Sequence, residues 1–209
     1  MDAGSIATSL QAAASQPWAL QESHAPAVSA LISDAMMGKD MTGDRLAKAF
    51  AANGPLRNAR GPELIQTKSG MTAIVSIRGI LLYDLDFPPF ATSSRKLAAD
   101  IRALASDESV SRIVLDIASP GGVVTGIPEA AEAIFKARQR KPVAAVANPF
   151  AGSAAYWLGA MAGEFAVTAS GDVGSLGVFL MHMDMSGALK KAGLDVTFIK
   201  AKTSPHKTD

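Results

Sequence analysis

The feature that most constrains this chain is a change of pattern near Met71, where strand-like and helix-like segments begin to alternate. The β-branched run 73–77 predicts a strand, and the spacing of Leu97, Ile101 and Leu104 predicts a helix after it. The alternation continues, with strands expected at 113–117, 143–147, 165–168, 178–181 and 196–199, and helices at 93–106, 127–135, 153–162 and 186–192. This order predicts an α/β architecture with parallel strands and right-handed crossovers.

Residues 1 to about 60 have another character. They are rich in alanine, and apolar residues such as Val28, Leu31 and Ile32 recur at helical spacing between Pro and Gly breaks. We therefore expect a short helical N-terminal appendage over residues 1–60 and a main domain over residues 61–209. Within that domain, segment 81–90 is apolar but broken by prolines, which predicts an irregular loop lining a groove or a subunit contact.

The composition excludes several classes of function. Lys and Arg number 20 against 19 Asp and Glu, so nothing in the charge balance favours a nucleic-acid partner. The absence of cysteine excludes disulfides, thiolate metal sites and a cysteine nucleophile. The first twenty residues lack a basic stretch followed by an apolar run, and no segment reaches the roughly 18 to 20 apolar residues of a membrane span. We expect a soluble, cytoplasmic protein without a membrane segment.

Two motifs stand where the predicted strands end, which is where α/β proteins usually place their sites. Ser119-Pro120-Gly121-Gly122 follows the strand at 113–117, and paired glycines can present a backbone N–H to a developing oxyanion. The same four residues also suit an ordinary turn. Ser153 stands at the start of a helix, where a nucleophile would be favoured by free N–H groups, although an N-cap is the commoner role there.

Two later segments complete the pattern. Three glycines punctuate residues 171–178. Because no Lys-Ser/Thr pair follows them and no helix is expected to open directly on them, the pattern favours a tight turn beside a substrate groove over a phosphate loop. The polar end of the chain, residues 204–209, follows the predicted strand 196–199 and contains Lys207. Taken alone, that segment is a solvated tail.

In this order the motifs resemble those of the signal peptide peptidase A family of serine peptidases, relatives of the Clp protease subunit. The resemblance covers residues 71 to 209 and implies a ClpP/crotonase-like fold of repeated β-β-α units with a mostly parallel sheet. It implies that Ser153 is the nucleophile and Lys207 the general base. By the same resemblance, the N–H groups of Gly122 and Ala154 form the oxyanion hole, and no metal or cofactor takes part.

We expect Gly121, Val123, Gly174 and Ser175 to line the substrate groove beside these residues. Within the family, the chain is most similar to phage head-maturation proteases. The segment Pro17-Trp18-Ala19-Leu20 is among the residues that carry this likeness. The likeness implies phage scaffold and capsid proteins as substrates, a homo-oligomer, a place in the host cytoplasm or procapsid, and a domain truncated at its C-terminus.

Other functions remain open from the residues alone. A signal-peptide or protein-quality peptidase of the same family is one, and a catalytically inactive capsid-assembly protein is another. A Ser-His-Asp triad would use His182 and Asp184, although His182 lies in an apolar run and His206 points away from Lys207 on an extended segment. Acyl-CoA chemistry on a crotonase-like scaffold does not require a serine at a helix start together with a lysine after the last strand.

Overall fold

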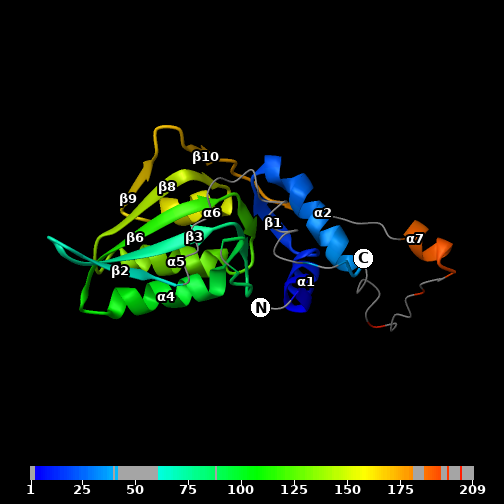
Figure 1. The fold of residues 1–209 in the computed structure, drawn as a ribbon, viewed down its shortest axis with the longest axis horizontal. Helices are drawn as coiled ribbons and strands as arrows, with labels where there is room; N and C mark the ends of the chain where they lie inside the picture. Colours follow the sequence, from blue (N-terminus) through cyan, green and yellow to red (C-terminus); the bar gives the residue numbers. More distant parts are fainter. Residues whose placement is uncertain are drawn as a thin grey trace.

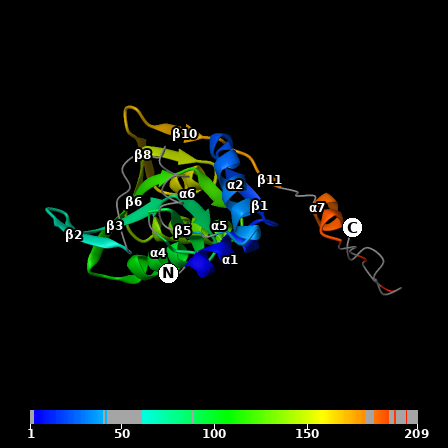
Figure 2. The ribbon, with the colours of Figure 1, turned by 45° about the vertical axis from the view of Figure 1, so that its right-hand side comes forward.

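The computed structural model describes residues 3–39, 41, 61–87, 89–180, 186–193, 197 and 203. The chain forms two sheets, with helices packed on the larger one and the N-terminal helices beside the smaller one (Figures 1 and 2). In chain order the elements are α1 (Ala3–Ala13), β1 (Pro17–Leu20), η1 (Glu22–His24), α2 (Ala25–Met36), β2 (Glu63–Thr67), β3 (Gly70–Arg78), β4 (Ile80–Leu82), β5 (Ala91–Ser93), α4 (Ser94–Ser106), β6 (Val110–Ser119), β7 (Gly121–Val123), α5 (Ile127–Ala137), β8 (Val143–Gly152), α6 (Ala154–Ala160), β9 (Glu164–Val167), β10 (Asp172–Gly174), β11 (Phe179–Leu180) and α7 (Ser186–Lys191). The predicted alternation of strands and helices is confirmed, except that strand 196–199 and residue 181 lie outside the described residues.

The larger sheet has the order β10-β8-β6-β3-β2, and β9 also pairs with β8. Its central strands β3, β6 and β8 are parallel, and only β2 joins antiparallel. The central strands β3, β6 and β8 are joined through helices α4 and α5, so this is the mostly parallel sheet that the sequence predicts.

The smaller sheet has the order β11-β1-β7-β4-β5 and is built from strands of two to four residues. Strand β3 passes into β4 across the single residue Gly79, and β6 passes into β7 across Pro120. Helix α5 then closes the unit of β6 and β7, and α4 closes the unit of β3 and β4 after the further short strand β5. These are the β-β-α repeats that the sequence implies. In the third unit, by contrast, β8 runs directly into α6 at Ser153.

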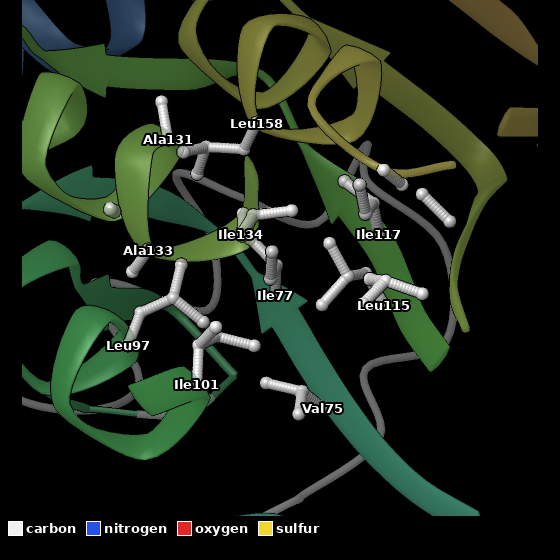
Figure 3. Packing of buried hydrophobic residues seen from close by; sticks show 14 of the residues in the cluster. Val75, Ile77, Leu97, Ile101, Leu115, Ile117, Ala131, Ala133, Ile134 and Leu158 are labelled. Carbon is white, nitrogen blue, oxygen red and sulfur yellow. The ribbon is translucent and has the colours of Figure 1, made fainter. Parts of the chain in front are cut away.

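The main core lies between the larger sheet and helices α4, α5 and α6 (Figure 3). Alternate strand residues such as Val75, Ile77, Leu115 and Ile117 face the helices, as the two-residue period of a strand requires. They pack on apolar residues of the helices, among them Ile134, which is fully buried. Burial of such side chains contributes roughly 1.5 to 3 kcal/mol each, so this cluster dominates the stability of the domain.

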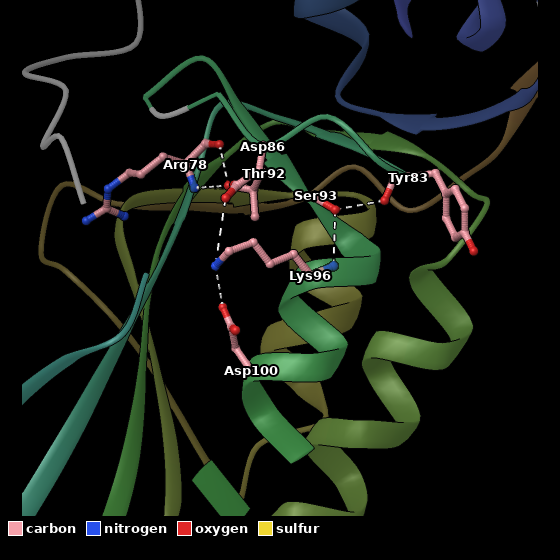
Figure 4. Close-up of polar contacts among 7 residues, drawn as sticks. All are labelled: Arg78, Tyr83, Asp86, Thr92, Ser93, Lys96 and Asp100. Carbon is pink, nitrogen blue, oxygen red and sulfur yellow. Dashed lines mark hydrogen bonds and ion pairs between the residues drawn. The ribbon is translucent and has the colours of Figure 1, made fainter. Parts of the chain in front are cut away.

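Helix α4 begins at a polar junction with β5 (Figure 4). Ser93 is its N-cap: the Oγ accepts a bond from Lys96 N at 3.1 Å and donates one to Tyr83 O at 2.9 Å. One residue earlier, Thr92 Oγ1 accepts from Arg78 N at 2.9 Å and donates to Arg78 O at 2.8 Å. These bonds join β3, β5 and α4 and fix where the helix starts.

The segment 81–90 is more ordered than the sequence predicts. Leu81 and Leu82 belong to β4, and Leu81, Leu82 and Leu85 are buried, while Tyr83 is exposed. The described residues after β4, 83–87 and 89–90, contain only turns, bends and one bridge, so the expected irregular loop is confirmed there. An apolar surface is not, because Leu81, Leu82 and Leu85 pack inside the protein. The homo-oligomer stays a prediction.

The N-terminal residues include a strand that the sequence analysis did not predict. Strand β1 pairs with β7 and β11 in the smaller sheet, and α1 and α2 pack beside it. Trp18 is fully buried in the resulting cluster, and its indole N–H donates to Ala13 O at 3.1 Å. The domain boundary near residue 60 stays a prediction. Within the described ranges, no helix has the length and apolarity needed to cross a bilayer.

Candidate active site

Ser153 stands between β8 and α6 in an unusual backbone conformation. Its φ of 50° and ψ of −113° lie in a region that costs a non-glycine residue of the order of 1 to 3 kcal/mol. An ordinary N-cap residue has extended dihedrals and a side chain bonded to the first helical turn, and Ser153 has neither. Its Oγ instead donates to Gly177 O at 3.3 Å. The N-cap alternative for this serine is therefore not what the structure shows.

The Ser-Pro-Gly-Gly motif lies beside this turn. Gly121 has a φ of 99°, and a methyl group placed on it would lie 3.0 Å from Gly152 O and 3.1 Å from Ala154 N. A methyl group on Gly122 would lie 1.9 Å from Leu81 O, so only glycine fits there. The expectation of a plain turn at these residues is thus corrected, because Gly121–Val123 form strand β7.

The segment after β10 closes the other side of the serine. Ser153 N donates to Gly174 O at 2.6 Å, and Gly174 pairs with Gly152 in the parallel register of β10 and β8. The next residue, Ser175, has a φ of 54°. The structure therefore brings Ser153, Ala154, Gly121, Gly122 and the 174–177 segment together, as expected for residues of one site.

An open hollow of about 490 Å³ adjoins this cluster. Gly174 and Ser175, two of the expected groove residues, line it. So do residues that follow β1, which the sequence analysis placed in an appendage: Gln21, Glu22 and Ser23. Val123 is buried in β7 and does not line this hollow.

Two contacts of the N-terminal segment with the site went unforeseen. Gln21 Nε2 donates to Asp172 Oδ2 at 3.3 Å, and the His24 ring stacks on Phe150 with centroids 5.9 Å apart. Phe150 lies in β8 shortly before Ser153, so the N-terminal residues reach the strand that leads to the serine. The only sequence signal was the compact run Pro17–Leu20, which is too short to show a strand period.

Several residues of the sequence analysis lie outside the described part of the chain. They include the expected base Lys207 and the residues of the rival triad: His182, Asp184 and His206. The roles assigned to them stay predictions.

Comparison with known proteins shows which family the C-terminal part of the chain resembles. Residues 136–208 match the model of peptidase family S49, and this stretch contains both Ser153 and Lys207. The match confirms the resemblance to peptidases of the signal peptide peptidase A type.

Two curated relatives come from phages. The chain is 31% identical to "Capsid assembly protease C" of Escherichia phage lambda over 181 residues, covering 85% of this chain and 40% of that protein. It is 35% identical to "Head-tail preconnector protein GP5" of Enterobacteria phage P21 over 140 residues, covering 66% of this chain and 28% of that protein. The chain thus spans less than half the length of either relative. The likeness to the phage head-maturation branch is confirmed.

Solved structures give weaker matches. An enoyl-CoA hydratase from Mycobacterium avium subsp. paratuberculosis has 14% identity and a TM-score of 0.36, with 53% of this chain and 48% of that chain covered. The Pseudomonas malonate decarboxylase MdcD–MdcE heterodimer has 16% identity and a TM-score of 0.39, with 66% of each chain covered. The fold assignment therefore rests on the sheet topology of this chain itself.

Proposed function

We propose that the protein is a serine endopeptidase in which Ser153 is the nucleophile and Lys207 is the general base. The observation that carries the proposal is the strained backbone of Ser153. The Ser153 hydroxyl does not cap helix α6, and the residue lies beside the two glycines of β7. Strained residues cluster at functional sites, where the surrounding structure over-determines them. Ser153 is also held by a backbone bond to Gly174 O, which fixes the direction of its side chain.

In this mechanism the Ser153 Oγ attacks the carbonyl carbon of a peptide bond while its proton passes to the Lys207 amine. The N–H groups of Gly122 and Ala154 stabilise the oxyanion, and each such donor typically contributes about 3 to 4 kcal/mol. The C–N bond then breaks as Lys207 returns the proton to the leaving nitrogen. Water attacks the acyl-enzyme by the reverse path and frees Ser153.

A lysine base must be neutral to accept that proton. An ordinary lysine has a pKa of about 10.4 and is charged at neutral pH, so Lys207 needs surroundings that disfavour its ammonium form. An arginine cannot replace it, because a guanidinium keeps its proton at every workable pH.

For substrates, we propose scaffold or capsid proteins cut during phage head assembly. The printed name of the phage lambda relative, a capsid assembly protease, supports this class. The small side chains around Ser153 favour an extended peptide with small or apolar residues at the cleaved bond.

The test is labelling of the full-length protein with a fluorophosphonate probe, together with hydrolysis of its capsid and scaffold proteins. Ser153→Ala should abolish both readouts. Lys207→Ala and Lys207→Arg should each abolish hydrolysis, and adding Ser153→Ala should make neither worse, because the two groups act as a unit.

Matched controls separate the dyad from its rivals. His182→Ala and His206→Ala should keep most of the activity, as should Ser109→Ala, which removes a hydroxyl from an exposed turn at the far end of β6. If Lys207→Ala still hydrolyses the substrate while a histidine variant does not, the Ser-His-Asp triad is supported and the dyad is rejected. Intact, folded protein without labelling at Ser153 would contradict the peptidase proposal altogether.

A further inference from the structure

We infer that β1 lies in the strand position where this site takes an extended peptide, so that residues 17–20 are an internal ligand of the site they cover. The inference rests on the proposed function, because it assigns the substrate position of that same site. It makes the N-terminal segment a competitor of the substrate.

The first support is the place of β1 in the smaller sheet. It lies between β7 and β11 and runs antiparallel to both. Strand β7 carries the glycines beside Ser153, and β11 follows the 174–177 segment that bonds to Ser153. An extended peptide that reached Ser153 would add to the same edge of β7, since strand addition satisfies its backbone groups. That edge is already occupied by β1.

The second support is the register. Val124 N donates to Pro17 O at 2.9 Å, and Gln21 N donates to Pro120 O at 2.7 Å. Hydrogen-bonded and non-hydrogen-bonded pairs alternate in an antiparallel ladder, and Gly122 stands opposite Ala19 midway between those bonds. Gly122 and Ala19 are therefore a hydrogen-bonded pair. The N–H proposed for the oxyanion hole faces the carbonyl of Ala19.

The position of that carbonyl agrees with the other proposed donor. A methyl group placed on Gly121 would lie 2.2 Å from Ala19 O and 3.1 Å from Ala154 N. The Ala19 carbonyl thus lies next to both backbone groups that would polarise a carbonyl under attack. Among the residues of β1, Ala19 takes the place of the substrate residue that precedes the cleaved bond.

The third support is burial. Ser153 is 3% exposed and Ala154 is 1% exposed, while Trp18 and Ala19 of β1 are 0% and 5% exposed. While β1 is in place, a nucleophile this covered cannot meet a protein substrate. Since β7 has one free edge at this point and β1 takes it, the bound states of β1 and of a substrate peptide exclude each other.

The contacts of β1 also indicate which peptide side chains the slot would accept. The Ala19 methyl joins the main core cluster, so the position opposite Gly122 fits a small side chain. Trp18 belongs instead to the second cluster, which combines α1 and α2 with residues of β4, β5 and β7, and its indole N–H donates to Ala13 O in α1. The slot therefore selects an extended peptide with a small residue opposite Gly122, whereas Trp18 anchors the internal copy.

A reversible crosslink between β1 and β7 tests this. Pro17 and Val124 are opposite each other in the ladder, a spacing that suits a disulfide, and the chain has no other cysteine. We would build Pro17→Cys with Val124→Cys in a Ser153→Ala background of the full-length protein. The ligand is a fluorescent peptide of residues 15–22, titrated to millimolar concentration and followed by anisotropy.

The reduced protein should bind the peptide, and oxidation should weaken binding at least tenfold, with each single-cysteine variant unaffected. Trp18→Ala, which removes the anchor, should tighten binding at least tenfold. Equal affinity in the two redox states, or no binding in either, would overturn the inference.

The same crosslink with Ser153 intact separates the two proposals. Hydrolysis should stop on oxidation and return with a reductant. Redox-dependent binding in the Ser153→Ala protein, with no hydrolysis when Ser153 is present, would reject the peptidase function and leave the peptide slot standing.

Discussion

The two sheets of the molecule differ in strand length and in how their residues pack. The larger sheet has central strands of nine or ten residues whose alternate side chains build the main core. The smaller sheet has strands of two to four residues drawn from distant parts of the described chain. At Gly121 and Gly122, backbone groups approach each other without room for a side chain. The larger sheet carries stability through side-chain volume, while the smaller one holds the site through backbone proximity. Substitutions should therefore act differently in the two.

The largest effect is expected for Gly122→Ala in the smaller sheet. The added methyl group would lie 1.9 Å from Leu81 O, and because the clash is with backbone, β4 and β7 must separate. We expect a loss of about 4 kcal/mol or more in the free energy of unfolding, measured by urea denaturation. Gly177→Ala is the control, since no atom lies within 4 Å of its added methyl, and it should change stability by less than about 0.5 kcal/mol. A mild Gly122→Ala would refute the role given to backbone proximity.

Ile134→Ala tests the larger sheet by removing volume from its core. Ile134 is fully buried between α5 and the sheet, so we expect a loss of about 3 to 4 kcal/mol by the same measurement. Ile65→Ala on β2, where the side chain is 38% exposed, should cost far less. Labelling of Ser153 by a small probe should persist in folded Ile134→Ala, because the smaller sheet is untouched. Loss of labelling in that folded protein would break the division between the sheets.

Asp116→Ala tests a buried ion pair between two strands of the larger sheet, β3 and β6, beside the point where β3 passes into β4. Arg78, at the end of β3, forms an ion pair with the Asp116 carboxylate and donates to Asp116 O at 2.7 Å, with its side chain 5% exposed. Removing the carboxylate leaves a buried cation, and we expect a loss of about 3 kcal/mol in thermal or urea unfolding. Asp84→Ala removes the partner of Arg95 in an exposed pair and should cost no more than about 1 kcal/mol. Equal losses would mean that burial of the Arg78 pair is unimportant.

The smallest effect concerns the strain at Ser153. Glycine adopts a φ of 50° without the steric cost that an alanine pays, so Ser153→Gly should be more stable than Ser153→Ala by about 1 kcal/mol. At Ala155, inside α6, the change Ala155→Gly should instead destabilise, because Gly is less favourable than Ala within a helix by about 1 kcal/mol. Differential scanning calorimetry of the three variants measures both. A Ser153→Ala protein as stable as the Ser153→Gly protein would show that the turn carries no strain.

What the sequence could predict follows the same division. Long strands and amphipathic helices have a hydrophobic periodicity that can be detected in the sequence. For this reason β3, β6, β8 and their helices were located correctly. The serine turn and the paired glycines were found because each follows a long apolar strand. The role of Gly121–Val123 as a strand was missed, since three residues are too few to show alternation.

The pairing of β1 could not be predicted for a different reason. Four residues gain their strand conformation only from partners far along the chain, and no local pattern in residues 17–20 specifies those partners. The helical spacing of Val28, Leu31 and Ile32 was read correctly as α2, but it carries no sign of where the helix docks.

The central place of β1 also sets an order of events on the ribosome. Roughly 100 residues separate Trp18 from its partner Val123, so the nascent strand waits on the order of 5 to 20 seconds for β7 at ordinary rates of synthesis. Val123 is made before Ser153, so β1 can pair with β7 before the serine turn exists. The growing chain can therefore pair β1 with this edge of β7 first and form the Ser153 turn beside it afterwards.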